Sequence, residues 1–161
     1  AGGRIVEIGN YQGRSTIALG LGAKVSSACV YSVDPHEDLQ VNVETSYGMK
    51  NHAALLRNLI DFDVAEVVRV ISVKSNVASC YWHGNVDLAF IDGSHEYEDV
   101  VTDLGWSMFI NGGKLVLHDT SGHFPGVTRA LDEFLARGVW EVVERVDSTA
   151  VLMSKYVRSQ G

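Results

Sequence analysis

Short apolar runs alternate five times with segments of helical periodicity, and this alternation restricts the possible fold more than any other feature of the chain. The runs occupy residues 5–8, 29–33, 67–71, 86–91 and 115–117. Their shortness and continuous hydrophobicity are typical of strands buried on both faces of a sheet. Strands and helices in alternation predict an α/β fold whose sheet is doubly wound, mainly parallel and joined by right-handed crossovers.

Apolar residues recur at helical spacing between and after these runs. Three stripes are present, formed by Leu55, Leu56, Leu59 and Ile60, by Tyr97, Val100, Val101 and Leu104, and by Val127, Ala130, Leu131, Phe134 and Leu135. Each stripe is expected to lie on one helix face and to pack into the core. After the last stripe, two strand-like runs at 140–146 and 149–154 are separated only by Asp147 and Ser148. So short a link predicts an antiparallel hairpin.

Length and charge exclude several classes of protein. The chain has 161 residues, and its 13 basic and 20 acidic side chains give a formal net charge of −7. We expect a single domain over residues 1–161, without a membrane span or a basic patch for nucleic acid. Cys29 and Cys80 lack the spacing of a metal site, so we expect buried, reduced thiols and a cytoplasmic protein.

A glycine-containing loop follows the first predicted strand in VEIGNYQGRSTIALG, residues 6–20. Gly9 and Gly13 let the backbone turn tightly and approach a ligand. A helix beginning near residues 13–15 would aim its free N–H groups at an anionic group. The spacing is G-x-x-x-G after an acidic residue, Glu7, and not the G-x-G-x-x-G of dinucleotide sites. The loop therefore indicates either a non-dinucleotide ligand or a structural turn.

Asp34 ends the second predicted strand about twenty residues after the glycines. A carboxylate at this place can accept hydrogen bonds from both hydroxyls of a ribose. The alternative is that Asp34 only begins a turn with Pro35.

Acidic and histidine residues follow the fourth and fifth predicted strands. Asp92 and His95 lie in IDGSHEYEDV, and His118 and Asp119 lie in LHDT. Carboxylates from neighbouring strand ends could share Mg²⁺ or Mn²⁺, with His118 as a third ligand. In the alternatives, one aspartate caps a helix or pairs with Arg129, His118 points into the sheet, and His95 only hydrogen-bonds Asp92.

The Glu-x-Gly-x-x-x-Gly loop, Asp34 and the terminal hairpin together resemble a class I S-adenosylmethionine-dependent methyltransferase. The resemblance implies a seven-stranded Rossmann-like sheet of order 3-2-1-4-5-7-6. It also implies that Gly9 and Gly13 line the methionine part of the cofactor, that Glu7 reaches the ammonium directly or through water, and that Asp34 holds the ribose. Pro35 or His36 would border the adenine, and Ser75 would contact its edge. The implied cofactor-binding residues are Glu7, Gly9, Asn10, Tyr11, Gly13, Ser15, Asp34, Pro35, His36, Ser75 and Asp92.

IDGSHEYEDV and LHDT resemble, more narrowly, the branch of macrocin O-methyltransferases and cephalosporin hydroxylase-like proteins. This resemblance implies that Asp92 and Asp119 hold magnesium and that His95 is the base. The expected catalytic residues are therefore His95 and Asp92. His118 departs from the pattern, because the magnesium-dependent members typically carry an acidic residue there.

The expected activity is O-methylation of a small hydroxylated metabolite, a sugar or a phenol. The early first strand leads us to expect that an N-terminal lid is absent and that a second copy could complete the site in a homo-oligomer. The alternative is a module that binds the cofactor without catalysis.

Overall fold

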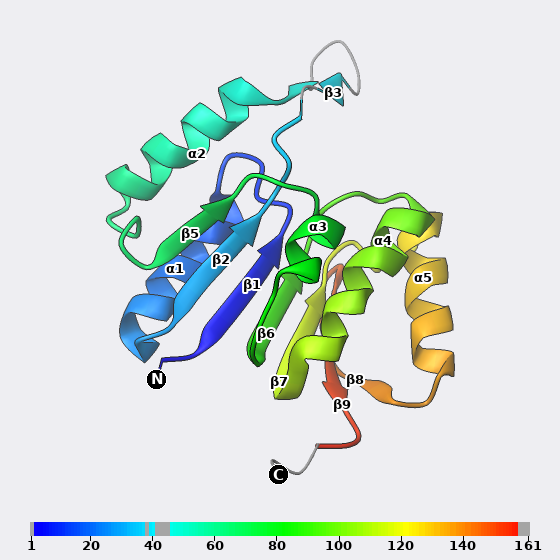
Figure 1. Cartoon of the computed structure of the whole chain (residues 1–161). Coiled ribbons are helices and arrows are strands. Elements are labelled where there is room, and N and C mark those ends of the chain that lie inside the picture. Colours follow the sequence, from blue (N-terminus) through cyan, green and yellow to red (C-terminus); the bar gives the residue numbers. More distant parts are fainter. Residues whose placement is uncertain (1, 38, 41–45, 158–161) are drawn as a thin grey trace.

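The computed structural model describes residues 2–37, 39–40 and 46–157, whose main sheet lies between two layers of helices (Figure 1). The strands of this sheet are β1 (Arg4–Ile8), β2 (Cys29–Val33), β5 (Val68–Ile71), β6 (Val86–Ile91), β7 (Ile110–Leu117), β8 (Trp140–Val146) and β9 (Thr149–Ser154). The helices are α1 (Arg14–Ser26), α2 (Met49–Asp61), α3 (Ser75–Cys80), α4 (Tyr97–Leu104), the 3-10 helix η1 (Gly105–Phe109) and α5 (Pro125–Ala136). The short strands β3 (Leu39–Gln40) and β4 (Ser46–Tyr47) pair separately, which the sequence pattern did not predict.

The strand order of the seven-stranded sheet is β5-β2-β1-β6-β7-β9-β8. Counted along the chain without β3 and β4, this is the order 3-2-1-4-5-7-6, so the predicted fold class is confirmed. The pairs from β5 to β7 are parallel, and β9 pairs antiparallel with both β7 and β8. The predicted terminal hairpin is therefore present, and β7 begins five residues before the apolar run 115–117 that predicted it.

Each face of the sheet has its own apolar core. On one face, α4 and α5 bury residues such as Val100, Leu104 and Phe134 against the strands. On the other face, Ala23 of α1 and Leu55 of α2 pack with residues of the β2 and β5 region. Helices on both faces cover the parallel strands, which explains why those strands have few polar residues.

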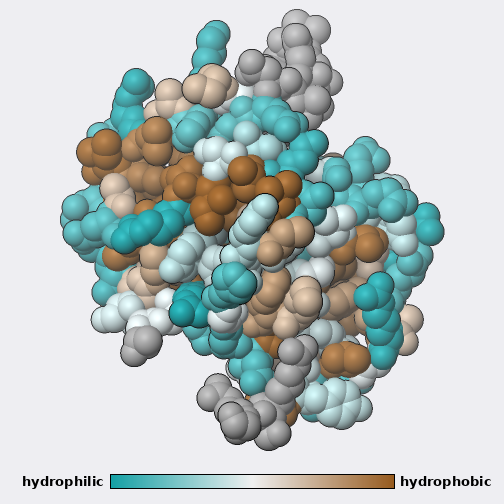
Figure 2. Space-filling view, viewed as in Figure 1, coloured by the Kyte–Doolittle hydropathy of each residue, from teal (hydrophilic) through white to brown (hydrophobic). Residues whose placement is uncertain are grey.

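Two expectations about burial are wrong. In α2, Leu55 and Leu59 are buried, but Leu56 and Ile60 are 44% and 69% exposed. Only the row of residues 51, 55 and 59 is buried, because α2 covers the side of the sheet near its edge strand β5. Figure 2 shows apolar surface gathered over this part of the molecule. Both cysteines are free, but Cys29 is half-buried and Cys80 is exposed. No helix within the described residues has the length and hydropathy to span a membrane.

Gly9 lies where the backbone after β1 packs directly against the backbone after β6. Its φ of 84° is in the left-handed region, and an added Cβ would overlap the backbone carbonyl of Asp92. The Asp92 N–H also donates to the carbonyl of Ile8 at 2.9 Å. The first glycine of the loop therefore allows the β1 and β6 ends to meet at one edge of the sheet.

Substitution Gly9→Ala should lower the free energy of unfolding by at least about 2 kcal/mol, because it adds backbone strain and a clash with Asp92. Gly22→Ala is the matched control, since Gly22 lies within α1 and no atom lies within 4 Å of an added Cβ. It should be neutral or stabilise by up to about 1 kcal/mol. Urea unfolding of both variants checks this, and a Gly9→Ala protein as stable as the wild type would contradict it.

Candidate active site

The candidate site lies at the carboxyl ends of β1, β2, β6 and β7, where the predicted residues follow the strands directly. The loop 9–13 turns between β1 and α1, with Gly9 N donating to the carbonyl of Val33 at 2.9 Å. Gly13, with φ 91°, precedes the first turn of α1 and provides no side-chain cap. The helix begins at Arg14, as the loop pattern predicted.

Asp34 lies against the backbone of this loop. Its Oδ2 accepts from the N–H of Asn10 at 3.1 Å and of Tyr11 at 3.4 Å, and its Oδ1 accepts from the N–H of His36 at 2.9 Å. The carboxylate is half-buried, and Pro35 beside it is exposed. Asp34 therefore joins the carboxyl end of β2 to the glycine loop, and its side chain remains partly accessible there.

Glu7 lies beneath the loop and is completely buried. Oε1 accepts from Ser15 Oγ at 2.6 Å, and Oε2 accepts from Thr16 Oγ1 and Ser32 Oγ, both at 2.6 Å. Burial raises the pKa of Glu7 above its usual value, while the three hydroxyl donors act in the opposite direction. Glu7 thus connects β1, β2 and the first turn of α1.

The buried side chains of Asn10 and His36 extend this network. Asn10 Nδ2 donates to Ser32 Oγ at 2.9 Å, and Asn10 Oδ1 lies 3.1 Å from His36 Nε2. The His36 ring stacks on His52 of α2 with a centroid distance of 3.9 Å and an angle of 6°. Burial lowers the pKa of His36 below its ordinary value.

Ser75, the first residue of α3, donates its hydroxyl hydrogen bond to Asp103 of α4. Asp103 is 5% exposed, and burial raises its pKa to about 6. Its carboxylate lies next to Gly93, because an added Cβ there would be 3.3 Å from Oδ2. Ser75 therefore serves at least as an internal link between α3 and α4.

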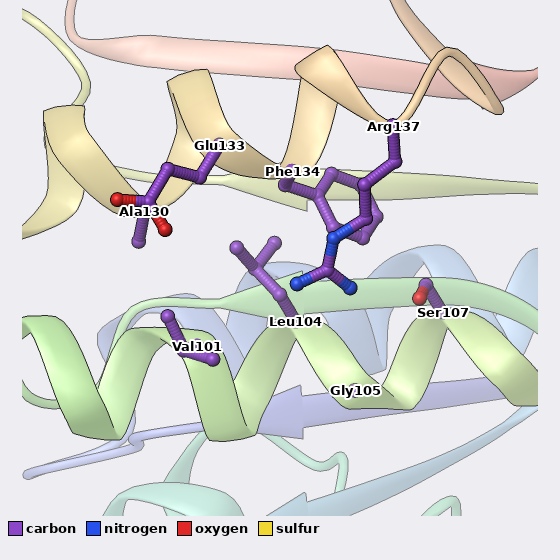
Figure 3. A pocket seen from close by; sticks show the side chains of 8 residues that line it. All are labelled: Val101, Leu104, Gly105, Ser107, Ala130, Glu133, Phe134 and Arg137. Carbon is purple, nitrogen blue, oxygen red and sulfur yellow. The ribbon is translucent and has the colours of Figure 1, made fainter.

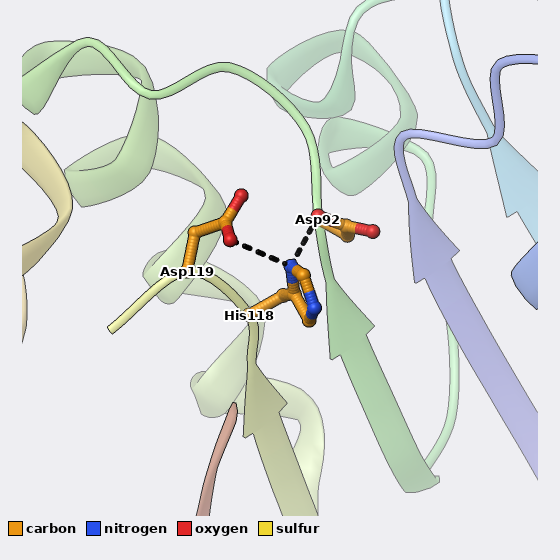
Figure 4. Close-up of side chains that lie close together, drawn as sticks. All are labelled: Asp92, His118 and Asp119. Atoms are coloured by element: carbon orange, nitrogen blue, oxygen red, sulfur yellow. Dashed lines mark ion pairs between the residues drawn. The ribbon is translucent and has the colours of Figure 1, made fainter. Parts of the chain in front are cut away.

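Asp92, His118 and Asp119 converge at the ends of β6 and β7 (Figure 4). His118 Nδ1 lies 3.2 Å from Asp92 Oδ1 and 3.2 Å from Asp119 Oδ1. Burial raises the pKa of Asp92, while nearby His118 lowers it and Asp119 raises it further. His118 therefore points to the aspartates, and the alternative that it points into the sheet is wrong.

The geometry of this trio fits a divalent cation. One ligand atom from each residue lies within 4.8 Å of the others. His118 Nδ1 is buried and has no partner with hydrogen-bond geometry, although two carboxylate oxygens lie near it. A cation bound by all three would satisfy this nitrogen and offset the repulsion between the two aspartates.

His95 pairs with Asp119 and not with Asp92. Its Nε2 lies 2.8 Å from Asp119 Oδ2, and its ring stacks on Phe124 at a centroid distance of 3.9 Å. Its side chain is 40% exposed. The pairing of an aspartate with Arg129 is also wrong, since Arg129 Nε contacts Glu133 Oε1 at 2.9 Å. Asp119, with φ 58°, thus presents one oxygen to His95 and the other to His118.

A separate cavity of about 80 Å³ lies between α4 and α5 (Figure 3). Its lining includes Leu104, Phe134 and Arg137, and none of the residues predicted for the site. It is a gap between two packed helices and is not part of the candidate site at the carboxyl ends of the strands.

The sequence pattern did not identify four side chains that support the site: Thr16 and Ser32, which donate to Glu7, Ser72, whose hydroxyl lies 3.1 Å from His36 Nδ1, and Asp103, which accepts from Ser75. Two of them carried a usable signal. Ser32 is the polar residue of the run CVYSV, and Asp103 lies three residues after the buried Val100 on the apolar face of its helix. A polar residue on a buried face requires an internal partner, which is how both could have been found.

The raised pKa of Asp103 predicts a pH-dependent stability. A folded-state pKa of about 6, against 3.8 for an ordinary Asp, means that the folded protein binds this proton more tightly. This contribution is complete below pH 3.8 and is lost as the pH rises through 6, by about 3 kcal/mol. Asp103→Asn removes the titration and keeps an acceptor for Ser75, so the variant should be more stable than the wild type at pH 7.5.

Thermal unfolding between pH 3.5 and pH 8 measures this difference. Glu7 and Asp92 shift in the same direction, so a smaller slope should persist in Asp103→Asn. Asp132→Asn, at an exposed position on α5 and remote from the Ser75–Asp103 pair, is the control and should keep the wild-type slope. An Asp103→Asn protein with that same slope would show that Asp103 does not titrate as described.

Comparisons with known proteins agree with this geometry. A sequence profile described as a methyltransferase domain matches residues 6–120. The SAH-bound methyltransferase PaMTH1 of Podospora anserina has a TM-score of 0.68 at 19% identity, over 95% of this chain and 72% of that chain. An SAH complex of an O-methyltransferase from Bacillus cereus has a TM-score of 0.70 at 17% identity, over 96% and 74%. TomG of Streptomyces achromogenes, an O-methyltransferase of tomaymycin synthesis solved with SAM, has a TM-score of 0.68 at 15% identity, over 95% and 73%.

At these identities the solved structures show a shared fold, while the profile match shows the family. The matched segment includes both the glycine loop and the residues Asp92, His118 and Asp119, and it spans well over half of the chain. The chain therefore belongs to the methyltransferase-domain family, and it shares its fold with methyltransferases that were solved with SAH or SAM.

Proposed function

We propose that this protein transfers a methyl group from S-adenosylmethionine to a hydroxyl oxygen of a small metabolite, a sugar or a phenol. The observation that carries the proposal is the position of the His95–Asp119 pair, which lies at the same edge of the sheet as the glycine loop and Asp34. Two of the structurally similar proteins are described as O-methyltransferases. In this proposal, the carboxyl ends of the strands would provide both the binding site for the methyl donor and the base that takes the proton from the acceptor hydroxyl.

The donor would lie across the loop 9–13, with its methionine part near Gly9 and Gly13 and its ribose hydroxyls on Asp34. Asp34 already accepts from backbone N–H groups, and charge-assisted bonds to the ribose would add about 1.5–3 kcal/mol each. Because Glu7 is completely buried, we infer that it reaches the ammonium through Ser15 or a water rather than directly. Asn10, Tyr11, Pro35 and Asp92 complete the proposed cofactor site, and His36 and Ser75 border it, because their polar side-chain atoms already have partners within the protein.

His95 is the proposed base. An ionised Asp119 can only accept, so the His95 nitrogen at 2.8 Å from it, Nε2, carries the hydrogen. Nδ1 of the neutral ring then has a lone pair for the acceptor proton. As the new O–CH₃ bond forms and the S–CH₃ bond breaks, that proton passes to Nδ1. Alignment of the oxygen with the methyl carbon contributes up to about 7–11 kcal/mol.

Asp92, His118 and Asp119 would hold the divalent cation in this proposal. When bound, such a cation orients a hydroxyl and lowers its pKa. Mg²⁺ follows from the resemblance to the macrocin-type enzymes, while an imidazole ligand is equally suited to Mn²⁺ or Zn²⁺. Asp119 could bind the cation through Oδ1 and still hold His95 through Oδ2, since the two oxygens face different partners.

Titration calorimetry with S-adenosylhomocysteine tests the donor site. We expect micromolar binding to the wild type and at least tenfold weaker binding to Asp34→Ala, which loses the acceptor for the ribose hydroxyls. The control is Asp132→Ala, an exposed acidic residue of α5 that should bind as the wild type does. Equal affinity for all three proteins would remove Asp34 from the cofactor site.

Turnover tests the role of His95, with an acceptor identified by screening for release of S-adenosylhomocysteine. His95→Ala should lower kcat by about 10²–10⁴-fold, the usual contribution of a general base, and leave cofactor affinity within about threefold. His123→Ala, at an exposed histidine near the same edge, is the control and should keep wild-type turnover. If His95→Ala turns over the acceptor at the wild-type rate, another group is the base. Binding of the cofactor without turnover of any acceptor would instead favour a non-catalytic module.

A further inference from the structure

A chain of hydrogen bonds runs from Ser72, just after β5, through His36, after β2, to the buried carboxyl group of Glu7. Ser72 Oγ lies 3.1 Å from His36 Nδ1, and His36 Nε2 lies 3.1 Å from Asn10 Oδ1. Asn10 Nδ2 is 2.9 Å from Ser32 Oγ, which is 2.6 Å from Glu7 Oε2. Glu7, Asn10, Ser32 and His36 are all buried.

The direction of every bond follows from Glu7. Ser32 Oγ donates its one hydrogen to Glu7 Oε2, just as Ser15 and Thr16 donate to the same carboxyl group, so Ser32 Oγ can only accept from Asn10. The amide nitrogen of Asn10 therefore faces Ser32, and its carbonyl oxygen faces His36. A carbonyl oxygen also only accepts, so His36 Nε2 carries a hydrogen. Since burial lowers the pKa of His36, the ring is neutral and Nδ1 accepts from Ser72.

The His36 ring has little capacity left for a ligand. Both of its nitrogens have partners within the protein, one ring face stacks on His52, and its exposed fraction is 8%. Its backbone, at φ 51°, also donates to Asp34. The contacts of His36 therefore favour a role in holding neighbouring residues over a role in hydrogen bonding to the adenine of the cofactor.

We propose that His36 is a positioning residue of the cofactor loop, whose Nε2-protonated ring begins a one-way hydrogen-bond chain through Asn10 and Ser32 to Glu7. The chain holds the Asn10 side chain, and with it the loop 9–13, in the geometry that receives the cofactor. This inference rests on the proposed function for its consequence, but the tautomer of His36 is a property of the free protein.

The first test is the tautomer, measured on the full ¹⁵N-labelled chain by long-range ¹H–¹⁵N NMR at pH 7. We expect a neutral His36 ring that is protonated at Nε2. His52→Phe keeps a ring stacked on His36 and should leave this pattern unchanged. A ring protonated at Nδ1, or at both nitrogens, would overturn the proposal even if no cofactor binds.

The second test uses two variants of His36 and the affinity for S-adenosylhomocysteine. His36→Gln places an amide nitrogen near the position of Nε2, whereas His36→Asn is too short to reach Asn10. We expect an affinity within about threefold of wild type for Gln and at least tenfold weaker for Asn. Asn tolerates a positive φ better than Gln, so a purely backbone role would give the opposite order. Equal affinities, or that opposite order, would contradict the chain.

Failure of this inference is distinguishable from failure of the proposed function. If the wild type does not bind S-adenosylhomocysteine, the cofactor proposal fails, and the tautomer alone decides whether the chain exists. If the wild type binds and His36→Asn binds equally well, the cofactor proposal stands and His36 has no positioning role.

Discussion

The buried carboxylate of Glu7 is the interaction on which the rest of the site depends. A charge at this depth is costly unless it is hydrogen-bonded, and three hydroxyls, from Ser15, Thr16 and Ser32, each donate to it at 2.6 Å. Because these donors come from α1 and β2 while Glu7 belongs to β1, satisfying one side chain fixes three elements relative to each other. The loop 9–13, which connects β1 to α1, is thereby held at the carboxyl ends of β1 and β2.

The edge of the sheet carries two functional halves that meet at β1 and β6. The glycine loop and Asp34 form the half that we assign to the methyl donor, and Asp92, His95, His118 and Asp119 form the half that we assign to proton removal and metal binding. Gly9 lies directly against the Asp92 backbone, so the halves are in contact. In such a site the position of the acceptor oxygen relative to the donor would be set by the spacing between two parallel strands.

The fold and the positions of the main site residues were largely predictable, because each depends on local pattern. The apolar runs and the two-residue link Asp147-Ser148 predicted the strands and the hairpin, and strand ends placed Asp34, Asp92 and Asp119 at one edge. Pairings between side chains were not predictable. Nothing in the sequence distinguishes Asp119 from Asp92 as the partner of His95, or shows that Ser75 would turn toward Asp103. The prediction that Leu56 and Ile60 are buried was wrong for a related reason. Helical spacing shows which residues share a helix face, but it does not show which other element covers that face.

A crystal structure of the protein with S-adenosylhomocysteine and a divalent cation would test most directly whether the methyl donor and the cation bind where we propose. We expect the ligand to lie over the loop 9–13 with its ribose hydroxyls on Asp34, and the cation to lie between Asp92, His118 and Asp119. A ligand bound elsewhere on the protein, or a ribose that does not contact Asp34 when the ligand is fully occupied, would contradict the central assignment of this edge as the methyl-transfer site.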